Sequence, residues 1–198
     1  MNGVAAFDFD GTLVKGDSLI PFLRRLCGPT ALALAGARSW RELAQLRKGG
    51  DARDVAKAAF LARLLPGVDA ARATALAEDY AGTLQARLRP DMAAKLRWHQ
   101  GEGHRVVIVS ASPALYLEPL GRRLGLDAVL ATGLVVGDDG RFTGQLLGAN
   151  CRGQEKARRL RLYLGDDPVT LWAYGDSAGD DEMLAMADHR VLTKARRR

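Results

Sequence analysis

The sequence predicts an α/β fold in which a mainly parallel sheet carries helices on its faces and an all-α segment is inserted near the start of the chain. Short apolar runs rich in β-branched residues alternate with helical patterns, as in right-handed βαβ units. One long segment, 15–89, shows helical spacing throughout. The chain has 198 residues, 47% of them hydrophobic, and is long enough to bury one core and a small insertion.

Apolar runs bounded by turn or helix signals supply the strands of the predicted sheet. The residues Gly137-Asp138-Asp139-Gly140 are typical of a hairpin turn, so we expect a β-hairpin over 133–148. The predicted strands are 4–9, 105–109, 169–174 and 190–193, with a shorter candidate at 128–131, and the predicted helices are 113–124, 154–164 and 180–187.

The segment 15–89 is rich in Ala, Leu and Arg. Breaks at Gly28-Pro29, Gly49-Gly50 and Pro66-Gly67 divide it into three to five predicted helices. Such a group of helices could serve packing alone, but its place directly after a pair of aspartates favours a lid over an active site. The predicted catalytic core is therefore 1–14 with 90–198, and the predicted helical cap is 15–89.

Charge is unevenly distributed along the chain. The formal net charge is +6, and the segment 15–89 holds 13 Lys and Arg against seven Asp and Glu. A basic cap favours anionic substrates and is compatible with peripheral contact to a membrane surface. Nucleic acid is not an expected partner, because aromatic residues make up only 6% of the chain and do not alternate with basic ones.

Targeting signals and cysteine usage predict a cytoplasmic protein. The first residues lack a basic region followed by an apolar one, and no window approaches the roughly 18 apolar residues of a membrane span. The two cysteines, Cys27 and Cys151, are far apart and are expected to be free thiols. The oligomeric state is not predicted.

Two carboxylates, Asp8 and Asp10, follow the first apolar run, and Gly11 indicates a turn directly after them. Ligands of open α/β sheets bind at the carboxyl ends of the strands. Two such acids repel each other unless a cation lies between them or one of them holds a proton. The pair alone is equally compatible with a solvated turn and with a binding site.

A second acidic cluster follows the run that ends at Tyr174 and contains Asp176, Asp180, Asp181 and Glu182. Mg²⁺ binds one or two carboxylates together with water, and would relieve the repulsion. For Asp176, at the strand end, we expect metal binding. Asp181 and Glu182 suit the first turn of a helix, where the helix dipole favours negative charge.

Between the clusters, an apolar strand ends in Ser110-Ala111-Ser112-Pro113. Pro113 is expected to open a helix, Ser112 to cap it, and Ser110 to contact a phosphate with the help of free N–H groups. A phosphate beside carboxylates also needs a cation. Lys156, at the start of a predicted helix, is a candidate for that role.

The ordered set formed by these motifs resembles the haloacid dehalogenase superfamily, and the helical insertion is similar to that of its phosphoserine phosphatase-like branch. The resemblance implies a Rossmann-like three-layer core with an inserted all-α helical cap. It implies that Asp8 is the nucleophile and that Asp10 is the general acid and base. The motifs that carry it are Asp8-Phe9-Asp10-Gly11-Thr12, Ser110, Lys156 and Gly175-Asp176-Ser177 with Asp180.

The resemblance also implies the remaining roles. Mg²⁺ would be bound by Asp8, Asp176 and the main-chain carbonyl of Asp10, with Asp180 in support through water or by orienting Lys156. Ser110 and Lys156 would bind the phosphoryl oxygens, and Thr12, grouped with them, would position Asp10. Dehalogenases of the superfamily lack the second aspartate, so Asp10 favours phosphoryl transfer.

The sequence departs from phosphoserine phosphatases at several positions. Ala111-Ser112 stands where they carry two glycines, whereas Asp17 matches an acidic residue that they carry after the first motif. Ala58 stands where their cap supplies an arginine, for which Arg53 or Arg63 could substitute. Arg152 becomes the alternative to Lys156 if Gly153 anchors the alignment.

The predicted function is a Mg²⁺-dependent phosphomonoesterase that acts through an aspartyl-phosphate on a small phosphorylated metabolite, with phosphoserine-like compounds among the candidates. One alternative is a lipid-phosphate phosphatase whose basic cap lies on a membrane surface. A third, from another class, is a non-catalytic phosphate-binding module.

Overall fold

A six-stranded sheet with the order β4-β3-β2-β1-β5-β6 forms the centre of the protein. In this computed structural model, residues 3–39, 52–166 and 168–193 are described. All neighbouring strands are parallel except β3 and β4, which pair antiparallel as a hairpin. The strands are β1 (Gly3–Phe7), β2 (Arg105–Pro113), β3 (Ala128–Val136), β4 (Phe142–Leu147), β5 (Thr170–Gly175) and β6 (His189–Leu192).

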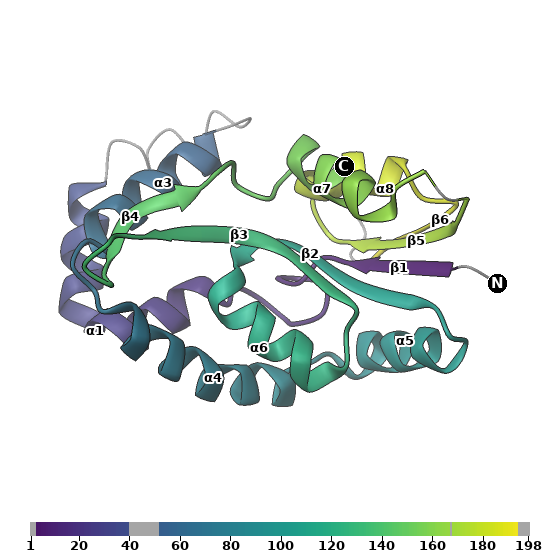
Figure 1. Cartoon of the computed structure of the whole chain (residues 1–198), viewed down its shortest axis with the longest axis horizontal. Coiled ribbons are helices and arrows are strands. Elements are labelled where there is room, and N and C mark those ends of the chain that lie inside the picture. The colour runs from purple at the N-terminus through teal and green to yellow at the C-terminus, as the bar shows by residue number, and fades with distance from the viewer. Residues whose placement is uncertain (1–2, 40–51, 167, 194–198) are drawn as a thin grey trace.

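Helices cover both faces of the sheet (Figure 1). On one side lie α5 (Pro90–Gly101) and α6 (Ala114–Leu124), and on the other α7 (Gln154–Leu164) and α8 (Asp181–Ala185). Side chains alternate between the faces of a strand. Accordingly, Ala5 and Phe7 of β1 pack into one hydrophobic cluster, and Val4 and Ala6 pack into the other.

Three helices of the inserted segment lie at one end of the sheet (Figure 1). They are α1 (Leu19–Arg38), α3 (Ala52–Leu64) and α4 (Ala70–Ala86). Helix α1 bends at Gly28, whose φ is 82°, just before Pro29. Helix α3 packs on β4, and α4 packs on α6. The two ends of the segment 15–89 are adjacent, since Val14 bridges Leu88 and the Arg89 N–H donates to the Leu13 carbonyl.

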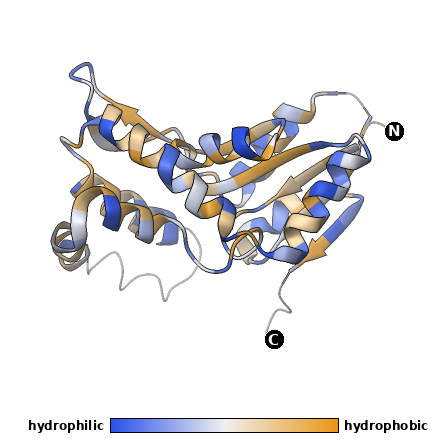
Figure 2. Ribbon diagram, turned by 90° about the horizontal axis from the view of Figure 1, so that it is seen from below, coloured by the Kyte–Doolittle hydropathy of each residue, from blue (hydrophilic) through white to orange (hydrophobic). Residues whose placement is uncertain are grey.

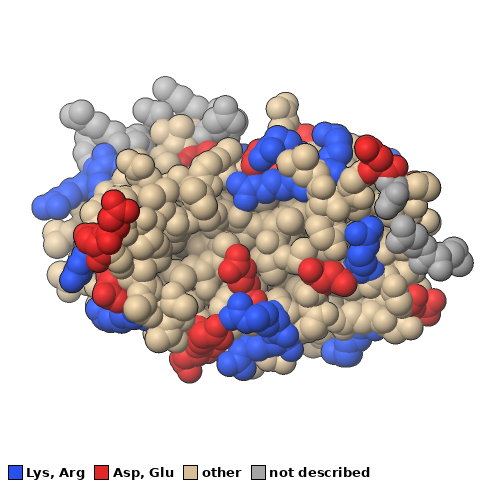
Figure 3. All heavy atoms as spheres, in the orientation of Figure 1, with Lys and Arg blue, Asp and Glu red and all other residues tan. Residues whose placement is uncertain are grey.

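Hydrophobic and polar residues are distributed according to these layers. Figure 2 shows hydrophobic residues along the central strands and mixed polarity on the helices that cover them. Basic and acidic side chains are both scattered over the face drawn in Figure 3. Among the described helices, none has the length and apolar character needed to cross a membrane.

The predicted fold class is confirmed, and so are the hairpin and the bounds of α7. Two local predictions are wrong. The first strand ends at Phe7 rather than at residue 9, because the chain turns at the acidic pair. Strand β2 runs to Pro113, so Pro113 and not Ser112 is the N-cap residue of α6. The last predicted helix, 180–187, is present but shorter: α8 covers Asp181–Ala185, and a 3-10 turn, η2 (Ala178–Asp180), precedes it. The predicted break at Gly49-Gly50 lies outside the described residues.

A buried histidine of α5, His99, contacts strand β5, which leads into the second acidic cluster. His99 is fully buried, and its two ring nitrogens lie 2.9 Å from Nδ1 of His104 and 2.8 Å from the hydroxyl of Tyr174. Burial lowers the pKa of His99 to about 4, and the neighbouring His104 acts in the same direction. His99 is therefore neutral in the folded protein at neutral pH, whereas its ordinary pKa is 6.5.

This histidine makes folding sensitive to acid. Below pH 6.5 the unfolded chain binds a proton at His99, whereas the folded chain binds it only near pH 4. The free energy of unfolding that neutral His99 contributes is therefore lost as the pH falls from about 6.5 to about 4. We expect His99→Asn to be less stable than wild type at about pH 7.5, but to lose less stability between about pH 7.5 and 5. Urea unfolding at both pH values measures this, with exposed His189→Asn as the control. Equal losses in wild type and His99→Asn would contradict it.

Candidate active site

Three neighbouring strands bring the predicted site residues to one edge of the sheet. Asp8 follows β1, Asp176 follows β5, and Ser110 lies near the end of β2. Strand β1 pairs with both of the others, and the Asp8 N–H continues the ladder by donating to the Tyr174 carbonyl at 2.9 Å. The parallel register therefore holds the first and second acidic motifs side by side.

Gly11 allows the first motif to turn tightly against the second. Its φ is +86°, in the left-handed region that side chains disfavour. A Cβ at this position would lie 2.2 Å from Oδ2 of Asp176, well inside any permitted contact. Both the backbone conformation and the close approach therefore require glycine here.

Lys156 joins two of the acids. Its Nζ donates to Oδ1 of Asp8 and to Oδ1 of Asp180, each at 2.6 Å, and the three residues are at most 6% exposed. Burial alone would lower the pKa of Lys156, but the charges of Asp8 and Asp180 outweigh it and raise the pKa above its ordinary value. Lys156 is therefore a permanent cation at the end of β1.

The pKa values of Asp8 and Asp180, the two partners of Lys156, shift in opposite directions. Burial raises the pKa of Asp8, which the positive charge of Lys156 opposes and the negative charge of Asp180 reinforces; the result is about 6. Burial acts on Asp180 in the same sense, but Lys156 and two backbone N–H groups hold its pKa below the ordinary value.

Asp180 is fully engaged as an acceptor. While Oδ1 accepts from Lys156, its Oδ2 accepts from the backbone N–H of Asp176 (3.1 Å), the backbone N–H of Ser177 (3.0 Å) and the Ser177 hydroxyl (3.0 Å). The Ser177 hydroxyl in turn accepts from the Gly179 N–H. Asp180 thus fixes the turn that carries Asp176 and orients Lys156 at the same time.

The acidic residues fit a hard divalent cation. Asp8, Asp176 and Asp180 each offer an oxygen, and these atoms lie within 4.8 Å of one another. Oδ1 of Asp10 is buried and has no hydrogen-bond partner among the described residues. Because Asp180 is committed to Lys156 and to the turn, Asp8 and Asp176 are the better-suited metal ligands. Oxygen donors of this kind suit Mg²⁺.

Asp10 is held by two hydroxyl groups that the sequence did not suggest. Its Oδ2 accepts from Ser18 at 3.0 Å and from Ser112. Burial raises the pKa of Asp10 to about 6, against the lowering effect of these two hydrogen bonds. A carboxyl with such a pKa can both give and accept a proton near neutral pH.

The other predicted phosphate contacts are buried at the same edge. The Ser110 hydroxyl accepts from the Ser112 N–H at 3.1 Å. Thr12 is buried, and its hydroxyl has no partner among the described residues. The hydroxyls that contact the Asp10 carboxylate are those of Ser18 and Ser112 instead, so the role predicted for Thr12 stays a prediction.

Lys156 and Arg152, the two candidates for the phosphate-site cation, lie in different surroundings. Lys156 contacts Asp8, whereas the Arg152 side chain packs over Gly179, where a Cβ would lie 3.0 Å from its Nε. A side chain at Gly179 would therefore require Arg152 to shift.

A cavity of about 500 Å³ lies between the start of α1 and helix α3. Asp17 lines it, and its Oδ2 also accepts from the Ile20 N–H at 2.8 Å. Of the two candidate arginines, Arg53 lines this cavity, whereas Arg63 donates to the Ser39 hydroxyl and the Ala59 carbonyl. Lys57, which sequence reasoning missed, lines the cavity as well.

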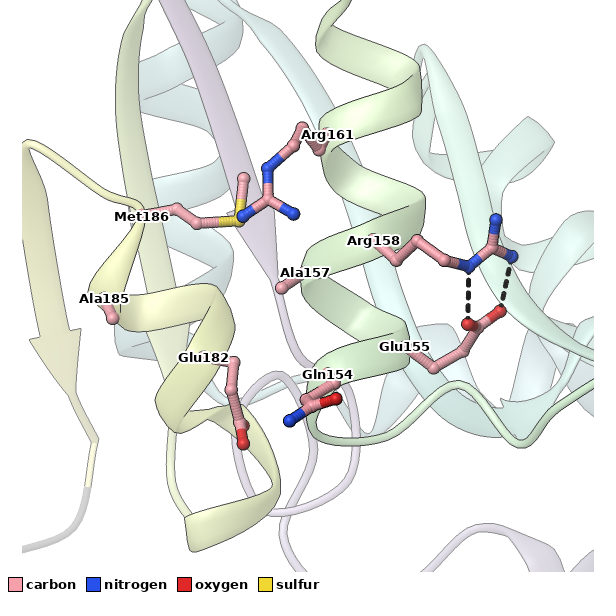
Figure 4. A pocket seen from close by; sticks show the side chains of 8 residues that line it. All are labelled: Gln154, Glu155, Ala157, Arg158, Arg161, Glu182, Ala185 and Met186. Carbon is pink, nitrogen blue, oxygen red and sulfur yellow. Dashed lines mark hydrogen bonds and ion pairs between the residues drawn. The ribbon is translucent and has the colours of Figure 1, made fainter.

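A second cavity, of about 630 Å³, lies between α7 and α8 and contains none of the predicted site residues. Figure 4 shows Glu155 paired with Arg158 at one side, and Glu182 and Gln154 at one end. Lys156 extends from α7 into the core instead, toward Asp8. Of the second acidic cluster only Glu182 lines this cavity, and none of Asp8, Asp176 and Asp180 does.

Removing the Lys156 charge leaves two buried carboxylates without their cation. We expect Lys156→Met to lose about 3 kcal/mol of unfolding free energy in metal-free buffer at about pH 7.5. The loss should be smaller at about pH 5, because protonation of the carboxylates relieves their repulsion. Urea unfolding measures both values, and exposed Lys95→Met serves as the control. A loss that does not depend on pH would argue against this account.

Comparison with known proteins places this geometry in a family. Protein CicA of Caulobacter vibrioides is 42% identical over 195 residues, which cover 94% of this chain and 84% of CicA. Phosphoserine phosphatase SerB1 of Mycobacterium tuberculosis is 30% identical over 199 residues, covering 96% of this chain and 64% of SerB1.

The fold is that of solved phosphoserine phosphatases. A substrate-bound phosphoserine phosphatase complex superposes with a TM-score of 0.69 at 20% identity, covering 97% of this chain and 86% of that one. The sequence model of the haloacid dehalogenase-like hydrolase family matches residues 5–185 of this chain. The resemblance inferred from the motifs is therefore confirmed, and the chain belongs to the haloacid dehalogenase-like hydrolases.

Proposed function

We propose that this hydrolase is a Mg²⁺-dependent phosphomonoesterase that transfers the phosphoryl group of a small phosphorylated metabolite to Asp8. The observation that carries the proposal is the Asp8 carboxylate held at 2.6 Å by Lys156, next to Asp176 and Asp180. The similarity to SerB1 and to phosphoserine phosphatase structures supports the same chemistry.

In the proposed reaction, an oxygen of Asp8 attacks phosphorus while the bond from phosphorus to the leaving oxygen breaks. Asp10 gives its proton to the leaving alcohol. In the second step Asp10 takes a proton from water, which attacks the aspartyl-phosphate and releases phosphate. The pKa of Asp10, near 6, and its two hydroxyl partners suit this double role.

Positive charge is needed where negative charge spreads over the phosphoryl oxygens. Lys156 would supply it from α7, and the hydroxyls of Ser110 and Thr12 would add donors, that of Thr12 having no hydrogen-bond partner in the described part of the chain. Mg²⁺, when bound by Asp8, Asp176 and the Asp10 carbonyl, would supply further charge neutralisation. Asp180 would act by orienting Lys156.

We further propose that residues 15–89 serve as a cap over a core formed by 1–14 and 90–198. The cavity beneath α3, lined by Asp17 and Arg53, would receive the part of the substrate beyond the phosphate. Phosphoserine-like compounds are among the candidates. If the substrate is instead a lipid phosphate, we expect the protein to co-sediment with anionic liposomes and to do so less at high salt. That result would favour a lipid phosphate over a small metabolite as the substrate.

The test uses p-nitrophenyl phosphate. We expect Mg²⁺-dependent hydrolysis by wild type and a loss of at least about 1000-fold in Asp8→Asn, because the amide cannot form the acyl phosphate. Asp79→Asn, an exposed aspartate on α4, is the control and should keep its rate within about twofold. A hydrolysis rate unchanged in Asp8→Asn would contradict the proposed mechanism. The absence of hydrolysis by wild type would favour a non-catalytic phosphate-binding module.

A further inference from the structure

Ser18 stands directly before helix α1 but does not cap it with its side chain. It occupies the N-cap position, yet its hydroxyl makes no capping hydrogen bond. The Ile20 N–H donates instead to Oδ2 of Asp17, at 2.8 Å. A serine at a helix N-cap normally accepts from a backbone N–H of the first turn. The Ser18 hydroxyl is therefore free for a different role.

That hydroxyl lies at the centre of a buried group of polar side chains. It donates to Oδ2 of Asp10 at 3.0 Å, and its oxygen lies 3.2 Å from the hydroxyl of Ser112 and 2.9 Å from that of Tyr116. Ser18 and Tyr116 are fully buried. The main-chain carbonyl of Ser18 accepts from the Tyr80 hydroxyl at 2.9 Å. Helices α6 and α4 thus hold Ser18, one through its side chain and the other through its backbone.

The number of protons in this group fixes the direction of its hydrogen bonds, because each hydroxyl has only one proton to donate. Ser18 and Ser112 both donate theirs to Oδ2 of Asp10. At the contact between Ser18 and Tyr116, the donor is therefore Tyr116. Burial, reinforced by the negative charge of Asp10, raises the pKa of Tyr116 well above its ordinary value, so the phenol keeps this proton. A chain of hydrogen bonds runs from Tyr116 through Ser18 to Asp10.

Aromatic neighbours fix the ring of Tyr116. Its centroid lies 5.0 Å from that of Phe22 and 5.5 Å from that of Tyr80, and the two tyrosine rings are nearly perpendicular. All three residues are at most 1% exposed. The packing therefore holds the Tyr116 hydroxyl in place beside Ser18, and Tyr116→Phe removes that hydroxyl while keeping the ring.

The two carboxylate oxygens of Asp10 have different surroundings. Oδ2 accepts from both serines, whereas Oδ1 is buried without a hydrogen-bond partner in the described part of the chain. A proton bound to Oδ2 would meet two hydroxyl protons that already point at this oxygen. When Asp10 holds a proton, Oδ1 is therefore the oxygen that carries it.

This arrangement suits the transfer of a proton to a leaving group. As the proton passes from Oδ1 of Asp10 to the leaving oxygen, negative charge develops on the carboxylate, and the donors on Oδ2 stabilise that charge. Tyr116 makes Ser18 a stronger donor, because hydrogen bonds in a chain polarise one another. Without the Tyr116 hydroxyl, Ser18 would have an unused acceptor site to which Oδ2 of Asp10 could donate. A proton on Oδ2 is not available to the leaving oxygen.

We propose that Tyr116 is a positioning residue of the reaction, which acts through Ser18 to keep the proton of Asp10 on Oδ1, where the leaving oxygen can receive it. The proposal rests on the proposed phosphatase function, in which Asp10 protonates the leaving alcohol. It goes beyond that function by giving a role to a tyrosine of α6 that acts on Asp10 only through another side chain.

The test compares two esters whose leaving groups differ in their need for a proton. Phenyl phosphate releases a more basic phenolate than p-nitrophenyl phosphate does, and so depends more on a general acid. The quantity measured is the ratio of kcat/KM for p-nitrophenyl phosphate to kcat/KM for phenyl phosphate, at one fixed pH. We expect this ratio to be at least about fivefold higher in Tyr116→Phe than in wild type, because protonation of the leaving group is impaired.

Tyr80→Phe is the matched control. It also removes a buried tyrosine hydroxyl that bonds to Ser18 at 2.9 Å, but that bond goes to the main-chain carbonyl and leaves the chain of hydroxyls to Asp10 intact. We expect Tyr80→Phe to change the ratio by less than about twofold. A general loosening of the packing around Ser18 would affect both variants and both esters alike.

Ser18→Ala removes the link between Tyr116 and Asp10. We expect it to raise the ratio at least about fivefold as well. Adding Tyr116→Phe to Ser18→Ala should then change the ratio no further, because the two residues act in one chain. Circular dichroism checks that each variant is folded, and if Tyr116→Phe does not fold, Ser18→Ala alone decides.

The outcomes separate this inference from the phosphatase assignment. An equal loss of kcat/KM for the two esters in Tyr116→Phe, or no loss for either, would overturn the role of Tyr116 and leave the phosphatase assignment intact. An unchanged ratio in Ser18→Ala, or a further rise in the double variant, would do the same. No hydrolysis of either ester by wild type would overturn the phosphatase assignment and this inference with it.

Discussion

The contact of one lysine with two buried aspartates governs the arrangement of this site. Without Lys156, Asp8 and Asp180 would be two carboxylates removed from water and facing each other, which is strongly unfavourable. With it, Asp180 has its remaining oxygen free to accept from the turn after β5, and that turn carries Asp176. Helix α7, strand β1 and the loop after β5 are thereby tied to one cation. The cluster still carries more negative than positive charge, and this excess is what a divalent cation would offset.

Much of the core could be predicted from the sequence, because its signals are local. Buried parallel strands read as apolar runs, and their carboxyl ends meet at one edge, so Asp8 and Asp176 were expected to be neighbours. Helix α7 has the predicted bounds, and Lys156 lies in its first turn, close enough to reach Asp8. The position of Gly11 also follows from its residue type, since the turn requires positive φ.

The remaining contacts could not be predicted, because they join segments far apart in the chain. Ser112 reaches Asp10 across 102 positions, and it does so because β2 continues past Ser110 through a bulge instead of giving way to a helix. No motif of the sequence singles out Ser18, which precedes α1, or Lys57, which lies on α3. The packing of α3 against β4 brings Lys57 to Ala111 and Asn150. These contacts therefore depend on how the segment 15–89 packs, whereas the acidic cluster depends on the sheet.

We propose that the acids around Lys156 form a site for one Mg²⁺, with Asp8 and Asp176 as its side-chain ligands. Isothermal titration calorimetry of Mg²⁺ into the metal-free protein measures this binding. We expect a single site in wild type and binding at least about tenfold weaker in Asp176→Asn, because one of the two charged ligands is lost. Equal Mg²⁺ affinity in wild type and Asp176→Asn, or no binding to wild type, would contradict it.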